Sequence, residues 1–222
     1  MKNQKTLLRT ACLALIVTLL ATAALCFAGC GKEPAKVDMT EIAKEINSRK
    51  TTDFEESSST TEYVRITVKD HGDIVLRLRE DIAPETVKNF RKLVSEKFYD
   101  GLTFHRVIPG FMIQGGDPKG NGTGSTTPVK GEMTANGFEN NLTHIRGVLS
   151  MARRGGDYNS GSCQFFICNA DAPHLNGEYA SFGYVVAGME TVDSISAVAT
   201  NAANNAPTES VVMEKVCFVK QK

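Results

Sequence analysis

The chain has 222 residues, with 25 Lys and Arg against 25 Asp and Glu, so its formal net charge at pH 7 is zero. This length allows one moderate domain with appendages, or two small domains. The balanced charge gives no basic surface of the kind that holds nucleic acid, so no nucleic-acid partner is expected. Six cysteines are present without a C-x-x-C spacing, which excludes the usual redox motif and a zinc site.

The first 29 residues have the pattern of a secretory signal. A basic start is followed by an apolar stretch over residues 11–27. Small residues then precede Cys30, which resembles a bacterial lipoprotein signal, with Cys30 as the lipid-bearing first residue. The alternative is an uncleaved membrane anchor at the short limit for a span. Either way, we expect the folded part at the extracytoplasmic face of a bacterial membrane.

Residues 30–61 are predicted to be a flexible tether between Cys30 and the folded domain. Pro34, many charges and a run of Ser and Thr over residues 57–61 leave little to bury. A short helix over residues 39–46 is compatible with the spacing of its apolar residues. As a flexible coil, the tether would span roughly 30 Å.

The folded domain is predicted over residues 62–222. Its elements, in chain order, are strands over 64–68 and 74–78 with a hairpin turn at 71–73, a helix over 84–98, a weaker helix over 191–198 and a strand over 211–219. More short strands with Gly-rich links lie between the helices. Many short strands with two helices fit a closed antiparallel barrel, which leaves no exposed sheet edge.

Three segments carry the most informative pattern. They read FHRVIPGFMIQGGD over residues 104–117, LSMARRGGDYNSGSCQFFIC over 149–168 and LNGEYASFG over 175–183. In the first of these segments, Arg106 stands among apolar side chains. This combination suits a surface that holds an apolar group and polarises one of its atoms. From composition alone, the alternative is a buried pair of strands joined by a turn at Pro109-Gly110.

In this order, the three segments closely resemble the cyclophilins, a family of peptidyl-prolyl cis-trans isomerases, over residues 64–218. The resemblance implies a mainly β fold, with an eight-stranded closed barrel and a helix closing each end. It also implies catalysis of rotation about X-Pro bonds in proline-containing polypeptides, without a cofactor or a metal. We expect the clients to be secreted or surface proteins.

The resemblance assigns roles to particular residues. Arg106 corresponds to the catalytic arginine of the family, and Gln114 to the glutamine that bonds the substrate carbonyl. The other substrate-binding residues that it implies are Phe111, Met112, Gly122, Ala152, Arg153, Gln164, Phe166, His174, Leu175 and Tyr179.

The chain departs from the family pattern around the groove. His174 stands where many members have Trp or Phe, which gives a smaller and more polar rim, so weak binding of cyclosporin is expected. Tyr179 stands where many members have His, which keeps an aromatic wall. The altered stretch from Arg153 to Cys163 touches the groove that reads the residues before proline.

Other functions stay open from the sequence. The same groove could serve as a binding module for proline-containing segments with little turnover. A purely structural surface lipoprotein and a redox protein that uses Cys163 are the remaining alternatives. We expect a monomer.

Overall fold

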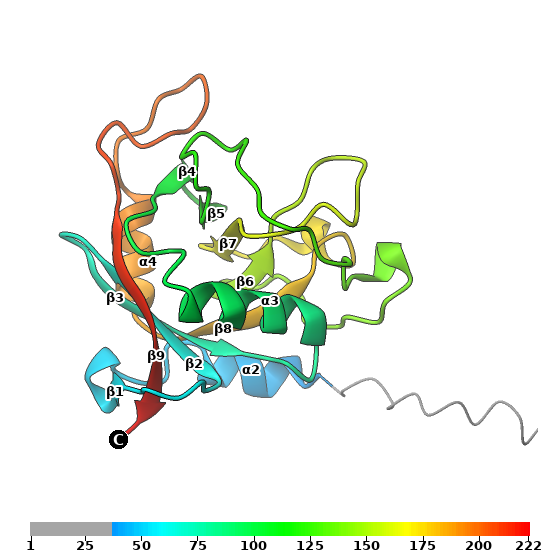
Figure 1. The fold of residues 1–222 in the computed structure, drawn as a ribbon, viewed down its shortest axis with the longest axis horizontal. Coiled ribbons are helices and arrows are strands. Elements are labelled where there is room, and N and C mark those ends of the chain that lie inside the picture. The colour runs from blue at the N-terminus through cyan, green and yellow to red at the C-terminus, as the bar shows by residue number, and fades with distance from the viewer. Residues whose placement is uncertain (1–36) are drawn as a thin grey trace, which may run out of the picture. The chain divides into compact units, whose positions relative to one another are not determined.

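The computed structural model describes residues 37–222, in which nine strands and three α-helices form a mainly β fold (Figure 1). The strands are β1 (Phe54–Glu56), β2 (Tyr63–Val68), β3 (Gly72–Leu78), β4 (Phe104–Ile108), β5 (Met112–Gly115), β6 (Val148–Met151), β7 (Phe165–Cys168), β8 (Ser181–Ala187) and β9 (Met213–Gln221). The helices are α2 (Met39–Glu45), α3 (Pro84–Ser95) and α4 (Met189–Ser196). The mainly β composition that the sequence predicted is confirmed.

The predicted signal segment and Cys30 lie outside the described residues. Within residues 37–222, no helix reaches the length and hydropathy that a membrane span requires.

Strands β2 and β3 form the predicted antiparallel hairpin. Val68 lies opposite Gly72, so the turn occupies residues 69–71, slightly earlier than predicted. Asp70 occupies the left-handed region with φ 61°, a conformation that the short polar side chain of Asp tolerates. Every second residue of β2 is buried, as the alternating pattern of a strand covered on one face requires.

Helix α3 follows the predicted amphipathic pattern. It begins at Pro84, whose fixed φ suits the first helical position. The apolar residues of its inner face are Val87, Phe90, Leu93 and Val94, all of them buried. The buried carboxylate of Glu132 accepts hydrogen bonds from the backbone N–H of Glu85 (3.0 Å) and Thr86 (2.8 Å). Glu132 thereby caps the helix, because Ala83 at the N-cap has no side chain that could do so.

The nine strands form one antiparallel sheet in the order β1-β9-β2-β3-β8-β6-β7-β5-β4. Its two ends approach each other, since an isolated bridge joins Thr103 to Val212 and Phe104 N donates to Val211 O (3.0 Å). The sequence predicted a closed barrel of eight strands with two helices. The structure has nine strands, because β1 adds to the outer edge of β9. Backbone hydrogen bonds from Gly101 N to Met213 O (2.8 Å) and from Met213 N to Leu102 O (2.8 Å) also join the segment before β4 to β9.

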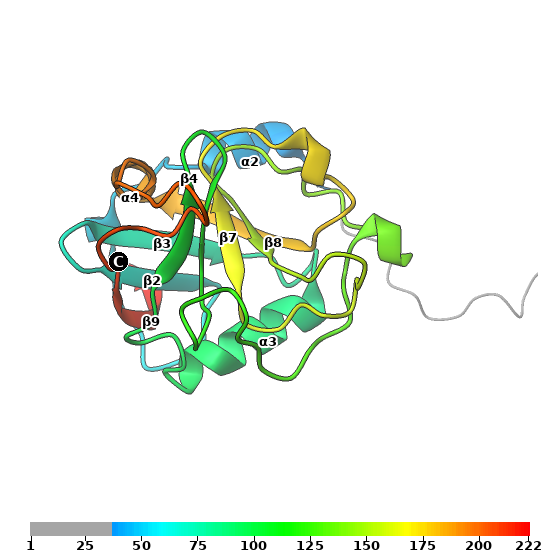
Figure 2. The same cartoon turned by 90° about the horizontal axis from the view of Figure 1, so that it is seen from above.

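Helices cover opposite sides of this sheet. Figure 2 shows α3 on one side of the strands and α2 and α4 on the other. Helix α4 begins two residues before the predicted helix, directly after Gly188, whose φ of 91° needs a residue without a Cβ. The last strand, β9, lies two residues later than predicted.

The predicted flexible tether is wrong for the residues from 38 onward, because they fold onto the domain. Asp38 caps α2 by accepting from Thr40 N (2.9 Å). Ile42 is 3% exposed and packs with Phe54 and Val75 in a second apolar cluster. Ile42 and Phe54 therefore attach this charged segment, and Val37, Met39 and Ile46 pack against the same cluster.

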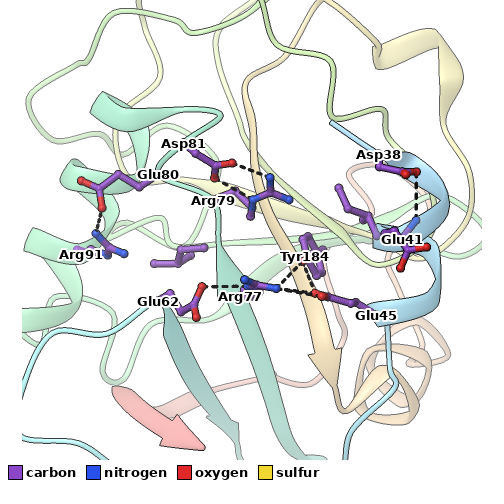
Figure 3. A pocket seen from close by; sticks show the side chains of 12 residues that line it. Asp38, Glu41, Glu45, Glu62, Arg77, Arg79, Glu80, Asp81, Arg91 and Tyr184 are labelled. Carbon is purple, nitrogen blue, oxygen red and sulfur yellow. Dashed lines mark hydrogen bonds and ion pairs between the residues drawn. The ribbon is translucent and has the colours of Figure 1, made fainter. Parts of the chain in front are cut away.

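Polar contacts also attach α2 to the sheet (Figure 3). Arg77 on β3 donates to Glu45 (2.8 Å) and to Glu62 (3.0 Å). The hydroxyl of Tyr184 on β8 donates to the same Glu45 carboxylate (2.5 Å). These bonds outweigh the effect of burial and hold the pKa of Glu45 below its usual value. The carboxylate is thus ionised at neutral pH, as the ion pair with Arg77 requires.

An aromatic cluster fixes the strand that leads to the site. Phe165 on β7 packs edge-to-face against Phe90, Tyr99 and Phe104, with ring centroids 5.6, 5.6 and 6.1 Å away. Because successive side chains of a strand point to opposite faces, Phe166 lies on the outer face of β7. The packed inner face thus sets the position of a cavity residue on the outer face.

Candidate active site

A β-bulge in β4 brings Arg106 to the outer face of the sheet. Phe104 pairs with Gly115 and Arg106 pairs with Gln114, so His105 is the extra residue. Bulges re-aim side chains in this way. As a result, Phe104 and Val107 both enter the core, while Arg106 is half-buried and lines a cavity.

Arg106 keeps donors free beside this cavity. Its Nη1 donates to Gln114 Oε1 at 3.3 Å. Within residues 37–222, no carboxylate lies within ion-pair distance of the Arg106 guanidinium, whereas Arg77, Arg79, Arg91, Arg146 and Arg153 each have at least one. A guanidinium presents five N–H donors, so Arg106 retains donors for a bound molecule.

A chain of amides positions Gln114. Its Nε2 donates to Gln164 Oε1 (2.9 Å), and Gln164 Nε2 in turn donates to the carbonyl oxygens of Gly124 (2.8 Å) and Gly122 (3.2 Å). The amide oxygen of Gln114 therefore faces Arg106, because its NH₂ group is committed to Gln164. This chain links the cation to the loop that follows β5.

Asp117 holds that loop in place. Its buried carboxylate accepts from the backbone N–H of Lys119 (2.8 Å), Asn121 (3.0 Å) and Gly122 (2.5 Å). Burial raises the pKa of this carboxyl, but the backbone donors outweigh burial and the pKa lies below its usual value. A Cβ on Gly124 would lie 1.8 Å from Asp117 Oδ1, so only glycine fits there.

An apolar cavity of about 210 Å³ adjoins Arg106. It is lined by Arg106, Phe111, Met112, Gln114, Ala152, Arg153, Phe166, Leu175 and Tyr179. Phe166 and Tyr179 meet edge-to-face with centroids 5.7 Å apart. The arrangement can hold a compact apolar group against aromatic and thioether surfaces, with one cation and one amide at its edge.

Buried polar side chains support the cavity floor. The ring of His144 stacks on Phe166 with centroids 6.0 Å apart. Its Nε2 bonds Ser150 Oγ (3.0 Å) on β6, and its Nδ1 bonds Asn176 Oδ1 (3.1 Å). Burial lowers the pKa of His144 to about 4, so the ring is neutral at pH 7. No local pattern in the sequence indicates this support.

A second cavity of about 360 Å³ shares Gln114, Ala152 and Arg153 with the first. Its remaining lining residues come from two loops and from Gln164: Gly122, Thr123, Gly124, Ser125, Pro128, Arg154, Ser160, Ser162 and Gln164. Serine, threonine and arginine side chains lie in this lining, and apolar atoms make up more than half of its exposed surface. The two cavities thus adjoin, with aromatic residues in the first and the hydroxyl-bearing residues in the second.

Arg153 separates the two cavities. Its guanidinium carbon lies 4.6 Å from the ring centroid of Tyr158 and 4.7 Å from that of Tyr179. It also pairs with the Glu178 carboxylate (3.1 Å) and donates to the Glu178 carbonyl oxygen (2.9 Å). Only 8% of the side chain is exposed. Arg153 is therefore a packed wall whose charge is already neutralised, and Tyr158 and Glu178, which sequence reasoning did not single out, hold it there.

The structure brings together most of the residues that the sequence predicted, in two groups. Gly122 and Gln164 line the second cavity and not the first. His174 lines neither cavity; it is exposed at the rim, where its ring lies 5.3 Å from that of Phe111. Within residues 37–222, no group of His, Cys, Asp or Glu could hold a metal ion.

A larger cavity of about 490 Å³ lies elsewhere, between α2, β3 and the segment before α3 (Figure 3). Its arginines are matched with carboxylates: Arg77 with Glu45 and Glu62, Arg79 with Asp81, and Arg91 with Glu80. Mutually satisfied charges leave little for a ligand to bond, so size alone does not make this cleft the candidate site.

Comparison with known proteins identifies the family of the chain. The family described as "Cyclophilin type peptidyl-prolyl cis-trans isomerase/CLD" matches residues 63–217. The chain belongs to this family. The activity is therefore that of a peptidyl-prolyl cis-trans isomerase.

Individual relatives show the same likeness. Peptidyl-prolyl cis-trans isomerase B of Bacillus subtilis (strain 168) is 48% identical over 130 residues, which cover 58% of this chain and 87% of the relative. A peptidyl-prolyl cis-trans isomerase of Synechococcus elongatus is 50% identical over 113 residues, or 50% of this chain and 72% of the relative.

A solved structure extends the likeness to the fold. The crystal structure of the cyclophilin-type isomerase of Cryptosporidium parvum, in the presence of the dipeptide Ala-Pro, is similar with a TM-score of 0.65 and 32% identity. The likeness covers 70% of this chain and 98% of that chain.

Proposed function

We propose that this cyclophilin-type isomerase accelerates X-Pro rotation by using Arg106 to stabilise the twisted prolyl amide. The observation that carries the proposal is a guanidinium without a carboxylate partner among the described residues, placed at the edge of an apolar cavity beside Gln114.

The chemistry requires little more than this arrangement. Resonance between the nitrogen lone pair and the carbonyl gives the peptide bond a rotational barrier of ~18–20 kcal/mol. In the twisted state this resonance is lost, and the prolyl nitrogen becomes a better hydrogen-bond acceptor. A donor aimed at that nitrogen therefore stabilises the transition state more than either planar isomer, which is the condition for catalysis. Arg106 can supply this donor, and no cofactor is needed for the step.

The apolar cavity would hold the proline ring. Its volume of about 210 Å³ equals that of roughly seven water molecules, which leaves room for a pyrrolidine ring against Phe111, Met112, Phe166 and Leu175. Gln114, positioned by Gln164, would bond the substrate backbone close to the rotating bond. When the ring and the flanking backbone are both held in place, rotation is confined to the X-Pro peptide bond.

We propose that the protein acts outside the cytoplasm as a monomeric bacterial lipoprotein. Support comes from the signal-like pattern of residues 1–29 and from Cys30 that follows it. Its clients would then be secreted or surface proteins that fold with slow X-Pro steps of ~10–100 s. Rotation of a bond consumes no nucleotide, which suits a compartment without ATP.

The rim also supports weak binding of cyclosporin. His174 is exposed and packs on Phe111, so a small polar ring borders the apolar cavity. A large cyclic apolar inhibitor would leave this imidazole poorly matched.

A redox role for Cys163 is not favoured. Cys163 is fully buried, and burial raises the pKa of its thiol above the usual value. Reactive cysteines need an exposed thiolate.

The test is cis-to-trans exchange of an Ala-Pro peptide, measured together with peptide binding, for the parent protein and Arg106→Ala. We expect acceleration by the parent and a loss of order 10²-fold in the variant, the scale for removing one transition-state donor. Peptide affinity should change far less. If the parent binds the peptide without accelerating exchange, a binding module becomes the better account. If Arg106→Ala retains full activity, the proposed role of Arg106 is wrong.

A further inference from the structure

The second cavity lies within reach of a peptide whose proline occupies the first. The two cavities share Gln114, Ala152 and Arg153 as lining residues. An extended chain advances ~3.3–3.6 Å per residue, so a side chain near the proline can enter the second cavity. The chemistry of that cavity can therefore select among client sequences.

The charged groups that line the second cavity are both arginines, Arg153 and Arg154, among the described residues. They differ in availability. The Arg153 side chain is 8% exposed and neutralised by Glu178. The Arg154 side chain is 78% exposed, and its contact with Asp157 is 3.5 Å long. An exposed pair of this length contributes little, so Arg154 can exchange its partner for a ligand group.

The nearby carboxylates do not cancel this charge. Asp157 does not line the cavity, and one of its oxygens accepts from Asn159 N (3.0 Å). Asp117 lies beneath the loop and is occupied by backbone N–H groups of the loop itself. The hydroxyl groups of Ser160 and Ser162 already donate to Asp157 O (2.7 Å) and to Cys163 Sγ (3.7 Å), so Arg154 is the group that can offer donors to an anion in this cavity.

We propose that the second cavity selects clients with an acidic side chain close to the proline along the chain, and that Arg154 is the specificity-determining residue. This inference rests on the proposed function, because it assumes that the proline ring occupies the first cavity. Arg154 would attract a Glu or Asp side chain into the second cavity and repel a Lys side chain from it. The packed Arg153 would shape the passage between the cavities without reading charge.

The experiment uses the purified protein and proline peptides that differ at one position. Glu, Gln or Lys is placed in turn at each of the three positions before the proline and the two positions after it. Exchange gives kcat/KM for each peptide at low salt. We expect one position at which Glu exceeds Lys by about two- to fivefold, the scale of an exposed charge pair. High salt should shrink the ratio, because exposed charges are screened.

Three variants separate this reading from a general charge effect. Arg154→Glu should bring the Glu-to-Lys ratio to unity or invert it. Asp157→Asn should raise the ratio, because it removes the competing charge and keeps an oxygen for Asn159 N–H. Lys88→Glu, at an exposed position on α3, makes the same charge change away from the cavities and should leave the ratio and the basal activity as in the parent.

The outcomes decide between the two proposals. A Glu preference that survives Arg154→Glu, or a ratio near unity at all five positions, overturns the charge selection while exchange of the Gln peptides still supports the proposed function. No acceleration of any peptide, neutral ones included, means that the proposed function itself has failed. A ratio that moves as much in Lys88→Glu as in Arg154→Glu also overturns the proposal, since it indicates net charge alone.

Discussion

The cavity beside Arg106 and the cleft beside α2 differ in their lining residues and in the pairing of their arginines. The first holds about 210 Å³, is lined mainly by apolar and aromatic residues and has one arginine without a carboxylate partner among the described residues. The second holds about 490 Å³, and its arginines Arg77, Arg79 and Arg91 are each paired with a carboxylate (Figure 3). The smaller feature is the one with donors left to offer.

This difference shows that the paired arginines of this fold contribute to stability, whereas the arginine without a carboxylate partner is available for function. A paired arginine uses its N–H donors in bonds within the protein. Arg77, for example, joins α2 to β3 and β8. Arg106 is positioned by one hydrogen bond to the Gln114 amide, and its other N–H donors are left for a bound molecule. Four predictions test this contrast.

The largest effect is expected from matched substitutions of the two arginines. Arg106→Gln should lower kcat/KM for an Ala-Pro peptide by about 10²–10³-fold with little change in Tm, because it removes a transition-state donor. Arg77→Gln should lower Tm and leave kcat/KM close to that of the parent. Exchange kinetics and thermal unfolding of both variants check this. Similar losses of activity in the two variants would break the contrast.

Next comes the attachment of α2. Ile42→Ala should destabilise the protein by about 2–4 kcal/mol, because Ile42 is 3% exposed in the second apolar cluster. Denaturant unfolding measures this loss. Hydrogen exchange should also quicken over residues 39–46 while isomerase activity stays. Unchanged exchange rates in this helix would contradict the proposed attachment.

The third prediction concerns pH. The pKa of His144 is about 4 in the fold, below its ordinary value of 6.5, so the unfolded chain binds the extra proton between these values. Stability should therefore fall as pH drops from about 6.5 to about 4, by roughly 2–3 kcal/mol from this group. Denaturant unfolding at several pH values gives the slope. His144→Gln should flatten that slope, and a variant with the parent's slope would assign the pH dependence to other groups.

The smallest effect is expected from the amide chain. Gln164→Met keeps the volume but removes the bonds to Gln114 and to the loop carbonyls. We expect about a three- to tenfold loss in kcat/KM, since one neutral hydrogen bond contributes ~0.5–1.5 kcal/mol. Ser57→Ala, far along the chain, serves as the control. A loss as large as that of Arg106→Gln would mean that Gln164 acts on the substrate directly.

The sequence predicted the elements whose signals are local. Alternation over β2 and β3 and the helical spacing after Pro84 depend on neighbouring residues, so they could be read directly. The placement of Arg106 beside Gln114 followed from one short segment that contains both strands. The bulge at His105 carries no such signal, because it is defined by the pairing with β5.

Features that depend on distant partners could not be predicted. Ile42 and Phe54 lie in a charged stretch with few apolar residues, and their burial requires Val75 on β3. Likewise, His144 is polar, and only Ser150 and Asn176 make its burial acceptable. The attachment of the expected tether and the floor of the cavity therefore depend on tertiary contacts, which the sequence does not show.

The short strand β1 has a consequence for how the chain can be shortened. It pairs with the outer edge of β9, opposite Val219, Lys220 and Gln221, and Asp53 O accepts from Lys222 N (3.0 Å). A chain cut at residue 61 would lose this strand and leave β9 as a bare edge. Unpaired edges recruit other strands, so the three residues from Phe54 to Glu56 protect the molecule against self-association.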